Sequence, residues 1–377
     1  MKVVLLGGSN SIKKNGLSKY FRDYHTIYNY SLGASSSLQN LYEIIRWEKV
    51  LEESDIVICE SNVNDFHNKN MLDTDIVTIE ENIKSLYERL SSVETKVIVL
   101  LLPLLTNKYK FKEEINNIHL KYIQLYKLDY IDIDLFYKKN DLEYFYDFDN
   151  LDHPLDYIMY RLGEKIIDNF HQYDLGFNKI YHDDCYIILN DFGCDKISKT
   201  NSQFNESITL ISDDLKLNHY AYEILGIHSW NDSNSILNIY SDNESYSRGG
   251  NNENQFHDIN TPFMIDSNTY IATSRCSLQS EKTIRFESNY VSDSNFGLVS
   301  LLLRKKDEKK IIEINRHGKI HNDLLDYILK ERNNIEQYIS FKRNKRWLYK
   351  FVARNKKNLF IRYLYSIKRL CFERKII

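Results

Sequence analysis

A serine stands directly after the first apolar run of the chain. Val3 to Leu6 form that run, which is long enough for a buried strand and too short for a signal-peptide core or a membrane span. The run breaks at Gly7 and Gly8, and Ser9 comes next. A hydroxyl held above the carboxyl edge of a sheet can act as a nucleophile, because open α/β sheets bind their ligands at that edge. Glycines followed by serine are also ordinary turn residues, so a purely structural role stays open at this point.

An imidazole far along the chain is the candidate base for that hydroxyl. Serine is a weak nucleophile at its ordinary pKa and needs a group that removes its proton as it attacks an acyl carbon. His153 can do this, since imidazole titrates near neutral pH and can return the proton to a leaving alcohol. Pro154 favours an extended backbone at His153, which suits a loop residue. Taken alone, a His-Pro pair is more typical of a surface loop.

Four short blocks follow strand-like runs or lie on a late loop. They are Gly7-Gly8-Ser9-Asn10-Ser11, Ser31-Leu32-Gly33-Ala34-Ser35, Asn62-Val63-Asn64-Asp65 and Asp152-His153-Pro154. In this order they resemble the blocks of the SGNH (GDSL-like) hydrolase family, and the resemblance covers about residues 1–170. The first block has Gly8 where the family has aspartate, and the third has Asn62 where the family has glycine.

The resemblance implies a role for each matching residue. Ser9 would form an acyl-enzyme, and His153 would be its general base. The oxyanion would be held by the backbone N–H groups of Ser9 and Gly33 and by the side-chain amide of Asn64, and such fixed donors contribute about 3 kcal/mol each. Gly33 also makes sense by itself, since a residue without Cβ lets a backbone donor approach a ligand.

The third member of the catalytic triad departs from the family pattern. The family has aspartate three positions before the histidine, and Asn150 stands there in this chain. An asparagine can orient an imidazole through its amide oxygen, as in Cys-His-Asn triads. Three arrangements stay open: Asn150 orients His153, the loop is shifted so that a flanking aspartate such as Asp149 or Asp152 does so, or the pair works as a Ser-His dyad.

Strand-like and helix-like segments alternate through the first part of the chain. The expected strands are 3–6, 25–30, 54–59, 96–102 and 130–135, and the expected helices are 17–23, 38–51, 79–90, 111–126 and 155–170. The alternation predicts a parallel sheet covered by helices on both faces. We therefore expect a three-layer, flavodoxin-like α/β domain of the SGNH-hydrolase type over residues 1–178, with Asn64 on the loop after the third strand.

From about Asp183 the pattern changes to short strand-like runs. They are separated by clusters of Asn, Asp, Ser and Gly, and they cover 186–189, 207–211, 235–240, 269–273, 282–286 and 297–303. This pattern predicts an antiparallel β-sandwich over residues 179–318. Aromatic residues in this region could bind a glycan by stacking on sugar rings, although packing in the sandwich core is the commoner role; they are Trp230, Tyr240, Tyr246, Phe256 and Tyr270.

The last segment, residues 319–377, is expected to be a basic amphipathic helical tail. Lysines and arginines alternate with aromatic and aliphatic residues after Ser340, and only Glu373 opposes their charge. Such a helix can lie on an anionic membrane surface, each basic group contributing on the order of 1 kcal/mol. Alternatively it docks its apolar stripe on the sandwich and leaves its lysines in water.

Composition limits the other classes of function. The net charge of −3 over 377 residues does not indicate a nucleic-acid partner. Five widely spaced cysteines without a CxxC pair are typical of reduced thiols in a cytosolic protein. The only dense ligand cluster, 182–185, has no second cluster to complete a metal site, and no nucleotide-binding glycine motif occurs, so neither metal nor cofactor is expected.

These observations predict an SGNH-type esterase or O-acetyltransferase that acts on an O-acylated carbohydrate. The expected setting is cytoplasmic, peripheral on the bacterial inner membrane, with a growing surface glycan as substrate. Hydrolysis and transfer use the same residues, so the sequence does not separate them. The alternative is a catalytically inactive scaffold that binds glycan and a membrane surface, an alternative that the asparagine at position 150 leaves open.

Overall fold

The chain begins with an α/β domain built on a five-stranded parallel sheet. The computed structural model describes residues 1–104, 110–142, 144–146, 153–181, 185–250, 253–273, 295–305, 311–341 and 343. The sheet has the strand order β2-β1-β3-β4-β5, and every neighbouring pair is parallel. Its strands are β1 (Lys2–Leu6), β2 (Thr26–Asn29), β3 (Ile56–Cys59), β4 (Lys96–Leu101) and β5 (Asp129–Asp132). The predicted α/β class is confirmed.

The strand order determines where a ligand can bind. The chain leaves β1 toward β2 on one side and continues with β3 on the other, so the order reverses between β1 and β3. In open α/β sheets of this order, the crevice at such a switch point, beyond the carboxyl ends of the strands, is the usual ligand site. Ser9 follows β1 and Asn64 follows β3, so the two lie on either side of this crevice.

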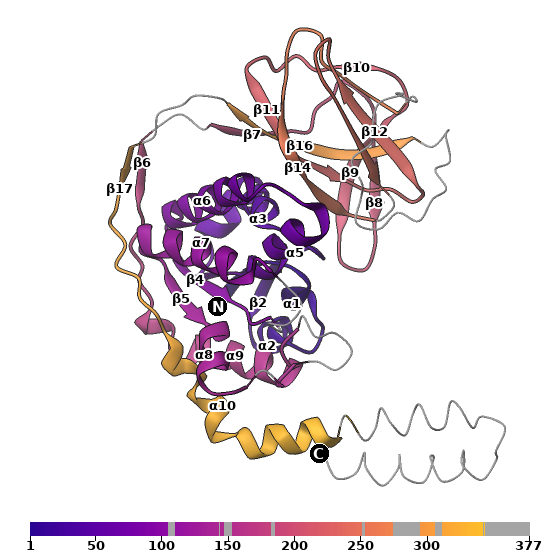
Figure 1. The fold of residues 1–377 in the computed structure, drawn as a ribbon. Coiled ribbons are helices and arrows are strands. Elements are labelled where there is room, and N and C mark those ends of the chain that lie inside the picture. Colours follow the sequence, from indigo (N-terminus) through magenta and orange to yellow (C-terminus); the bar gives the residue numbers. More distant parts are fainter. Residues whose placement is uncertain are drawn as a thin grey trace, which may run out of the picture.

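Helices cover both faces of the sheet (Figure 1). One side carries α3 (Ser37–Arg46), α6 (Ile76–Ser92) and α7 (Lys112–Leu125), and the other carries α2 (Leu17–Tyr24), α8 (Ile133–Lys139) and α9 (Asp156–Asp168). The remaining elements are α1 (Ser9–Ile12), α4 (Glu48–Glu52), α5 (Asn62–Leu72) and the 3-10 turn η2 (Phe170–Gln172). The nearly continuous apolar runs of β1, β3 and β4 are buried between these two layers, as expected for parallel strands.

Two expected boundaries differ from the structure. Residues 62–65 were expected on a loop, but they form the first turn of α5. The strand expected over 130–135 ends at Asp132, whose side chain accepts a hydrogen bond from the N–H of Leu135 and so caps α8. The cap at Asp132 is a polar side chain that starts a helix, which apolar periodicity alone does not reveal.

The second part of the chain is an antiparallel sandwich of two sheets. One sheet has the order β10-β15-β12-β13, and the other has the order β14-β11-β16-β9-β8 with β7 also paired to β16. Apolar residues from both sheets meet in one buried cluster, which includes Ile239 and Ile271 from one sheet and Ile227 and Leu301 from the other. The strands are β7 (Tyr186–Leu189), β8 (Lys196–Thr200), β9 (Asn205–Ile211), β10 (Leu215–Lys216), β11 (Tyr222–Ser229), β12 (Ser235–Tyr240), β13 (Ser245–Gly250), β14 (Gln255–Met264), β15 (Tyr270–Ala272) and β16 (Phe296–Lys305). The predicted separate antiparallel unit is therefore confirmed.

The aromatic residues of the sandwich are largely structural. Trp230 packs with Ile208 and Val299 in a small buried cluster, and Tyr246 belongs to the main core. Tyr240 and Tyr270 are half-buried and stack on each other with ring centroids 5.7 Å apart. Packing rather than sugar stacking accounts for these four positions.

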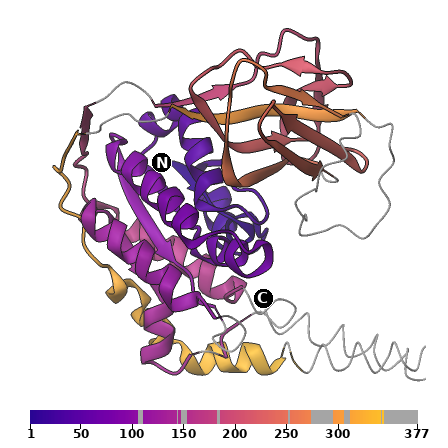
Figure 2. The same cartoon turned by 45° about the horizontal axis from the view of Figure 1, so that its top comes forward.

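The sandwich rests on α3 of the α/β domain, and both views show this contact (Figures 1 and 2). Leu38 and Tyr42 on α3 pack against Leu225 and Leu302 of the sandwich. The buried hydroxyl of Tyr42 lies 2.8 Å from His228 Nδ1 and 2.9 Å from Ser300 Oγ, so polar contacts also cross this boundary.

After β16 the chain returns to the α/β domain. β17 (Ile311–Glu313) pairs with β6 (Lys179–Tyr181), and the buried guanidinium of Arg316 donates to the carbonyl oxygens of Ser91, Val93 and Thr95. The 3-10 turn η3 (Asn322–Leu325) and α10 (Asp326–Lys330) then add apolar side chains to the core of that domain.

The described start of the last segment packs on the α/β domain. Leu325, Ile328, Ile335 and Ile339 are buried there. The basic helix after Ser340, expected either to lie on a membrane or to dock on the sandwich, lies almost wholly outside the described residues, so both alternatives stay predictions. Within the described part of the chain, no helix combines the length and apolarity needed to cross a bilayer. The domain boundaries at 178 and 318 stay predictions.

Candidate active site

Ser9 stands on a sharp turn between β1 and α1. The strand ends at Leu6, Gly7 and Gly8 make the turn, and Ser9 is the first residue of the helix. The carbonyl oxygen of Gly8 accepts hydrogen bonds from the N–H groups of Ser11, at 3.1 Å, and Ile12, at 3.3 Å. The helix therefore starts immediately, and the Ser9 side chain is presented at the carboxyl edge of the sheet.

His153 meets this serine from the other end of the domain. Ser9 Oγ lies 2.6 Å from His153 Nε2, although 144 positions separate the two residues. When Nε2 carries no proton, the hydroxyl donates to it, which is the contact that a general base needs. His153 is only 7% exposed, and two residues later, just before α9, the N–H of Leu155 donates to the carbonyl oxygen of Phe145.

The three predicted oxyanion donors belong to elements that follow β1, β2 and β3. Ser9 contributes the free backbone N–H of a first helical residue, and Asn64 contributes a side-chain amide from the first turn of α5. Gly33 lies on the loop after β2, which is held against the turn because the N–H of Leu32 donates to the carbonyl oxygen of Gly7 at 3.1 Å. Among the described residues, none accepts a hydrogen bond from these three donors. Their expected role as oxyanion donors stays a prediction.

The position of Asn64 explains why residue 8 is a glycine. A Cβ added to Gly8 would lie 1.9 Å from Asn64 Nδ2, so the amide occupies the space where a side chain would begin. The aspartate that the family has at this position does not fit beside Asn64 as it is placed. The departure at Gly8 therefore brings the amide directly over the turn that carries Ser9.

The steric argument for Gly33 is not supported. A Cβ added to Gly33 would meet no atom within 4 Å, and Gly33 and Ala34 are both exposed. Its predicted role as a donor needs the backbone N–H but does not need the absence of a side chain.

Glu60, which the sequence analysis did not identify, lies beneath the turn. It follows β3 directly, is 1% exposed, and its Oε1 accepts hydrogen bonds from Gly8 N–H at 2.7 Å and from Ser11 Oγ at 3.0 Å. Burial raises the pKa of this carboxyl to about 7, against the opposing effect of these two hydrogen bonds. A carboxylate placed directly after the wholly apolar run of β3 was the signal that could have revealed it.

Two aspartates attach the start of α3 to α5, which carries Asn64. Asp65 on α5 accepts a hydrogen bond from the N–H of Ser37, at 2.8 Å, at the start of α3. Asp258 on β14 of the sandwich accepts from Ser36 Oγ at 2.7 Å and from Asn68 Nδ2 at 3.1 Å. The Gly33 loop and the Asn64 helix are therefore fixed to each other, and the sandwich contributes to fixing them.

The residue that orients His153 is not placed by the structure. Asn150, Asp149 and Asp152 all lie outside the described residues, so the alternatives among them stay predictions. Within the described part of the chain, no group of three or more His, Cys, Asp or Glu side chains has the arrangement of a metal site.

Comparison with solved structures finds chains that resemble the α/β domain. AlAXEase, an acetyl xylan esterase, is 17% identical with a TM-score of 0.38, and the match covers 45% of this chain and 98% of that one. TesA is 16% identical with a TM-score of 0.36, covering 46% and 99%. Axe2, an acetylxylan esterase from Geobacillus stearothermophilus, is 11% identical with a TM-score of 0.33, covering 45% and 91%. Each of these matches covers less than half of this chain and nearly all of the neighbour. Comparisons with protein-family models and with curated proteins find no match.

Proposed function

We propose that this protein carries out serine-dependent acyl-ester chemistry on an O-acylated carbohydrate. The observation that carries the proposal is the 2.6 Å contact between Ser9 Oγ and His153 Nε2. A second observation supports it, since the three donors beside Ser9 have no acceptor among the described residues. A nucleophile, its base and a set of free donors are what acyl transfer through an acyl-enzyme requires.

The first half of the reaction forms the acyl-enzyme. Ser9 Oγ attacks the acyl carbon while its proton passes to His153 Nε2, and the former carbonyl oxygen becomes an oxyanion held by Ser9 N–H, Gly33 N–H and Asn64. The tetrahedral intermediate then collapses, the bond to the leaving alcohol breaks, and His153 returns the proton to that alcohol. The acyl group remains as an ester on Ser9.

The second half regenerates Ser9. Either water or a sugar hydroxyl attacks the ester, its proton passes to His153, and Ser9 Oγ leaves and takes that proton back. Water gives an esterase and a sugar hydroxyl gives an O-acyltransferase, with the same residues in both cases. Gly33 and Ala34 are exposed, so a substrate can reach the Gly33 N–H from solvent.

The proposal is tested by steady-state assays with an aryl acetate and with acetylated oligosaccharides. The wild-type chain should release the aryl alcohol, and Ser9→Ala should lower kcat by about 1,000-fold or more. Ser92→Ala is the matched control, because among the described residues its hydroxyl binds only the Arg89 carbonyl oxygen at the end of α6. Added sugar acceptors that divert the acetyl group from water would identify a transferase.

The opposite result would favour the inactive scaffold. If the wild-type chain and Ser9→Ala are equally inert toward the aryl acetate and the acetylated oligosaccharides, the acyl-enzyme proposal is wrong. Glycan binding without turnover would then be the remaining function for the fold.

A further inference from the structure

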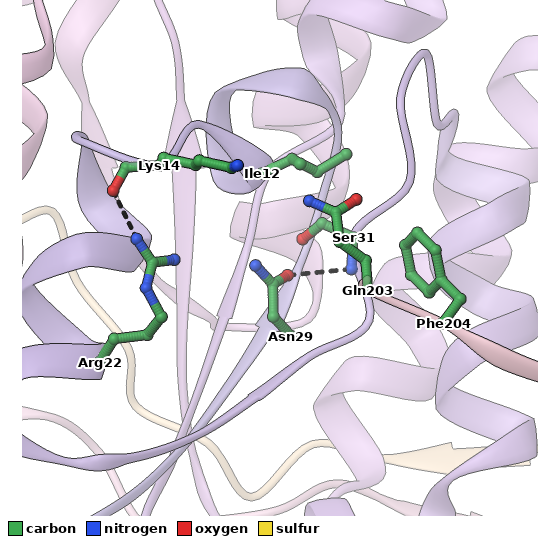
Figure 3. A pocket seen from close by; sticks show the side chains of 7 residues that line it. All are labelled: Ile12, Lys14, Arg22, Asn29, Ser31, Gln203 and Phe204. Carbon is green, nitrogen blue, oxygen red and sulfur yellow. Dashed lines mark hydrogen bonds between the residues drawn. The ribbon is translucent and has the colours of Figure 1, made fainter. Parts of the chain in front are cut away.

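A cavity of about 330 Å³ lies where the catalytic edge of the sheet meets the sandwich (Figure 3). Its α/β side is formed by Lys14, Arg22 and Asn29, together with Ile12 and Ser31. Its other side is the tip of the hairpin that joins β8 to β9. Cavities between two domains that combine apolar and polar lining are the usual place for small ligands.

The cavity is adjacent to the nucleophile. Ile12, which lines it, is the last residue of the short helix α1 that begins with Ser9, and side chains three apart on a helix are neighbours roughly 5–6 Å apart at Cβ. Asn29, also in the lining, donates from Nδ2 to the carbonyl oxygen of Ser11 at 3.1 Å. A ligand in the cavity therefore lies against the same short helix that carries the hydroxyl that would attack its ester.

The lining is positively charged. Of the residues that line the cavity, Lys14 and Arg22 are basic and none is acidic. Among the described residues, the Lys14 ammonium has no hydrogen-bond acceptor and no carboxylate partner. Arg22 is held in place because it donates to Ser18 Oγ at 2.8 Å and to the carbonyl oxygen of Lys14. A cavity with two cations and no counter-charge attracts an anion.

A buried hydroxyl without a partner also points to a ligand. Ser31 is 1% exposed and lines the cavity, and within the described part of the chain its Oγ has no hydrogen-bond partner. Its backbone N–H is fixed to Asn29 Oδ1 at 3.1 Å, as Figure 3 shows. Since buried polar atoms are nearly always hydrogen-bonded, this hydroxyl is available to a bound molecule.

The sandwich completes the cavity with an aromatic ring and an amide. Phe204 and Gln203 stand at the hairpin tip, where Asn201 Oδ1 accepts both of their N–H groups at 2.9 Å and so fixes the turn. In Figure 3 the Gln203 amide lies over Ser31 and the Phe204 ring stands beside it. A half-buried ring next to hydrogen-bonding side chains suits a sugar, which has an apolar face and polar edges.

We propose that this cavity binds the acidic part of the substrate, a carbohydrate that carries a carboxylate or phosphate group next to the esterified sugar. The inference deepens the proposed function and rests on it for the ester. Lys14 and Arg22 bind the anion, Ser31 and Asn29 bind sugar hydroxyls, and Phe204 contacts a sugar face. The sandwich is then part of the substrate site.

Ligand-observed NMR on the full-length wild-type chain tests the inference without requiring turnover. The probes are glucuronate, glucose 6-phosphate, glucose and inorganic phosphate. One or both acidic sugars should bind at least about tenfold more tightly than glucose, since a hydrogen bond to a charged group contributes more than a neutral one. Which of the two binds more tightly distinguishes a carboxylate from a phosphate. Inorganic phosphate should bind more weakly than glucose 6-phosphate, because the sugar contacts are missing.

Variants assign the binding to this cavity. Lys14→Ala should remove the preference for acidic sugars, Lys14→Arg should retain it, and Phe204→Ala should weaken the binding of the acidic sugars. Lys19→Ala is the control, because that lysine is paired with Asp23 on the outside of α2. The inference is overturned if glucose binds as tightly as both acidic sugars, or if no sugar binds detectably. It is also overturned if inorganic phosphate binds as tightly as glucose 6-phosphate, or if Lys14→Ala keeps the preference for acidic sugars. An inert wild-type chain in the aryl acetate assay would overturn the proposed function alone, since this binding assay does not depend on it.

Discussion

At the residue scale, the turn that carries Ser9 depends on two neighbours that touch Gly8 from opposite sides. Asn64 Nδ2 fills the space where a side chain at Gly8 would begin, because a Cβ built on Gly8 would lie 1.9 Å from it. Glu60 accepts the Gly8 N–H at 2.7 Å. A substitution at this glycine therefore acts on the oxyanion donor and on the turn together.

Gly8→Ala should lower kcat on an aryl acetate by about 100-fold or more, because Asn64 must move and one oxyanion donor is lost. Gly16→Ala is a matched control. Both glycines precede a helix with nearly the same backbone angles, φ −101° and ψ −148° at Gly8 and φ −92° and ψ −136° at Gly16. A Cβ at Gly16 would meet Met159 Cβ only at an ordinary 3.5 Å. Equal kcat values for the two variants would show that a Cβ at residue 8 does not disturb catalysis by displacing Asn64.

Buried carboxyl groups give the protein a specific dependence on pH. Burial raises the pKa of Glu43, Glu60 and Asp258 to about 7 in each case. A raised pKa means that the folded state binds more protons than the unfolded state between the two values. The stability that each group contributes is therefore complete below its unfolded pKa and is lost as the pH rises through about 7.

Glu60→Gln should remove one of these contributions. As the pH rises from 5 to 7, the free energy of unfolding of the wild-type chain should fall relative to that of the variant by up to about 1.4 kcal/mol per pH unit. Urea unfolding at several pH values measures this difference, and Glu52→Gln, at an exposed position, is the control. Parallel pH profiles for the wild-type chain and Glu60→Gln would contradict the assignment of a raised pKa to Glu60.

At the element scale, the first turn of α5 is fixed by side-chain contacts and not by helix propensity. Asn62 donates to the carbonyl oxygen of Leu102 at 2.9 Å and to Asn116 Oδ1 at 3.0 Å, and its Oδ1 accepts the N–H of Leu102 at 3.1 Å. Where the family has glycine, this chain therefore uses an asparagine to attach α5 to the end of β4. The attachment sets the position of Asn64 in the same turn.

Asn62→Ala should lower the free energy of unfolding by about 1–3 kcal/mol, because a buried backbone N–H and carbonyl lose their partners. It should also lower kcat, since Asn64 is no longer held. The control is Asn70→Ala on the same helix, whose amide donates to the Phe66 carbonyl oxygen at 2.9 Å and to no other group in the described part of the chain. Chemical denaturation and aryl acetate kinetics measure the two effects. If Asn62→Ala is destabilised but keeps the wild-type kcat, the attachment of α5 by Asn62 is not needed for catalysis.

The same contacts explain how far the elements could be predicted. The apolar runs of β1, β3 and β4 predict buried strands directly, since their burial follows from composition. The sequence also predicted that Ser9 follows the first strand and that His153 lies just before the last helix of the α/β domain. The start of α5 was not, because residues 61–65 have no apolar periodicity and the turn is formed by contacts with Leu102 and Asn116, which only the folded sheet brings near.

At the scale of the whole molecule, the sandwich supports the catalytic edge of the α/β domain. Asp258 is buried and accepts hydrogen bonds from Ser36, at the start of α3, and from Asn68, on α5. Those two elements carry or adjoin the Gly33 loop and Asn64. The sequence predicted that a sandwich exists, but not where it docks. Contacts such as that of Tyr42 with His228, 186 positions apart, have no local signature in the sequence.

Asp258→Ala should therefore affect catalysis from the other domain. Ser36 Oγ and Asn68 Nδ2 lose their acceptor, so the free energy of unfolding should fall by about 1–3 kcal/mol. The kcat on an aryl acetate should fall by about tenfold, since a displacement of the oxyanion donors weakens their contribution. Asp214→Ala, at an exposed position of the sandwich, is the control. If both variants retain the wild-type kcat, the sandwich does not position the donors.

The contact between Ser9 and His153 is the central claim, and a pre-steady-state burst measures it most directly. Mixed with excess aryl acetate, the wild-type chain should release close to one equivalent of aryl alcohol rapidly, and the peptide that contains Ser9 should then carry an acetyl group. His153→Ala should lose the burst although Ser9 is present, because no base removes its proton. An acetyl group on another residue, or a full burst in His153→Ala, would contradict the account.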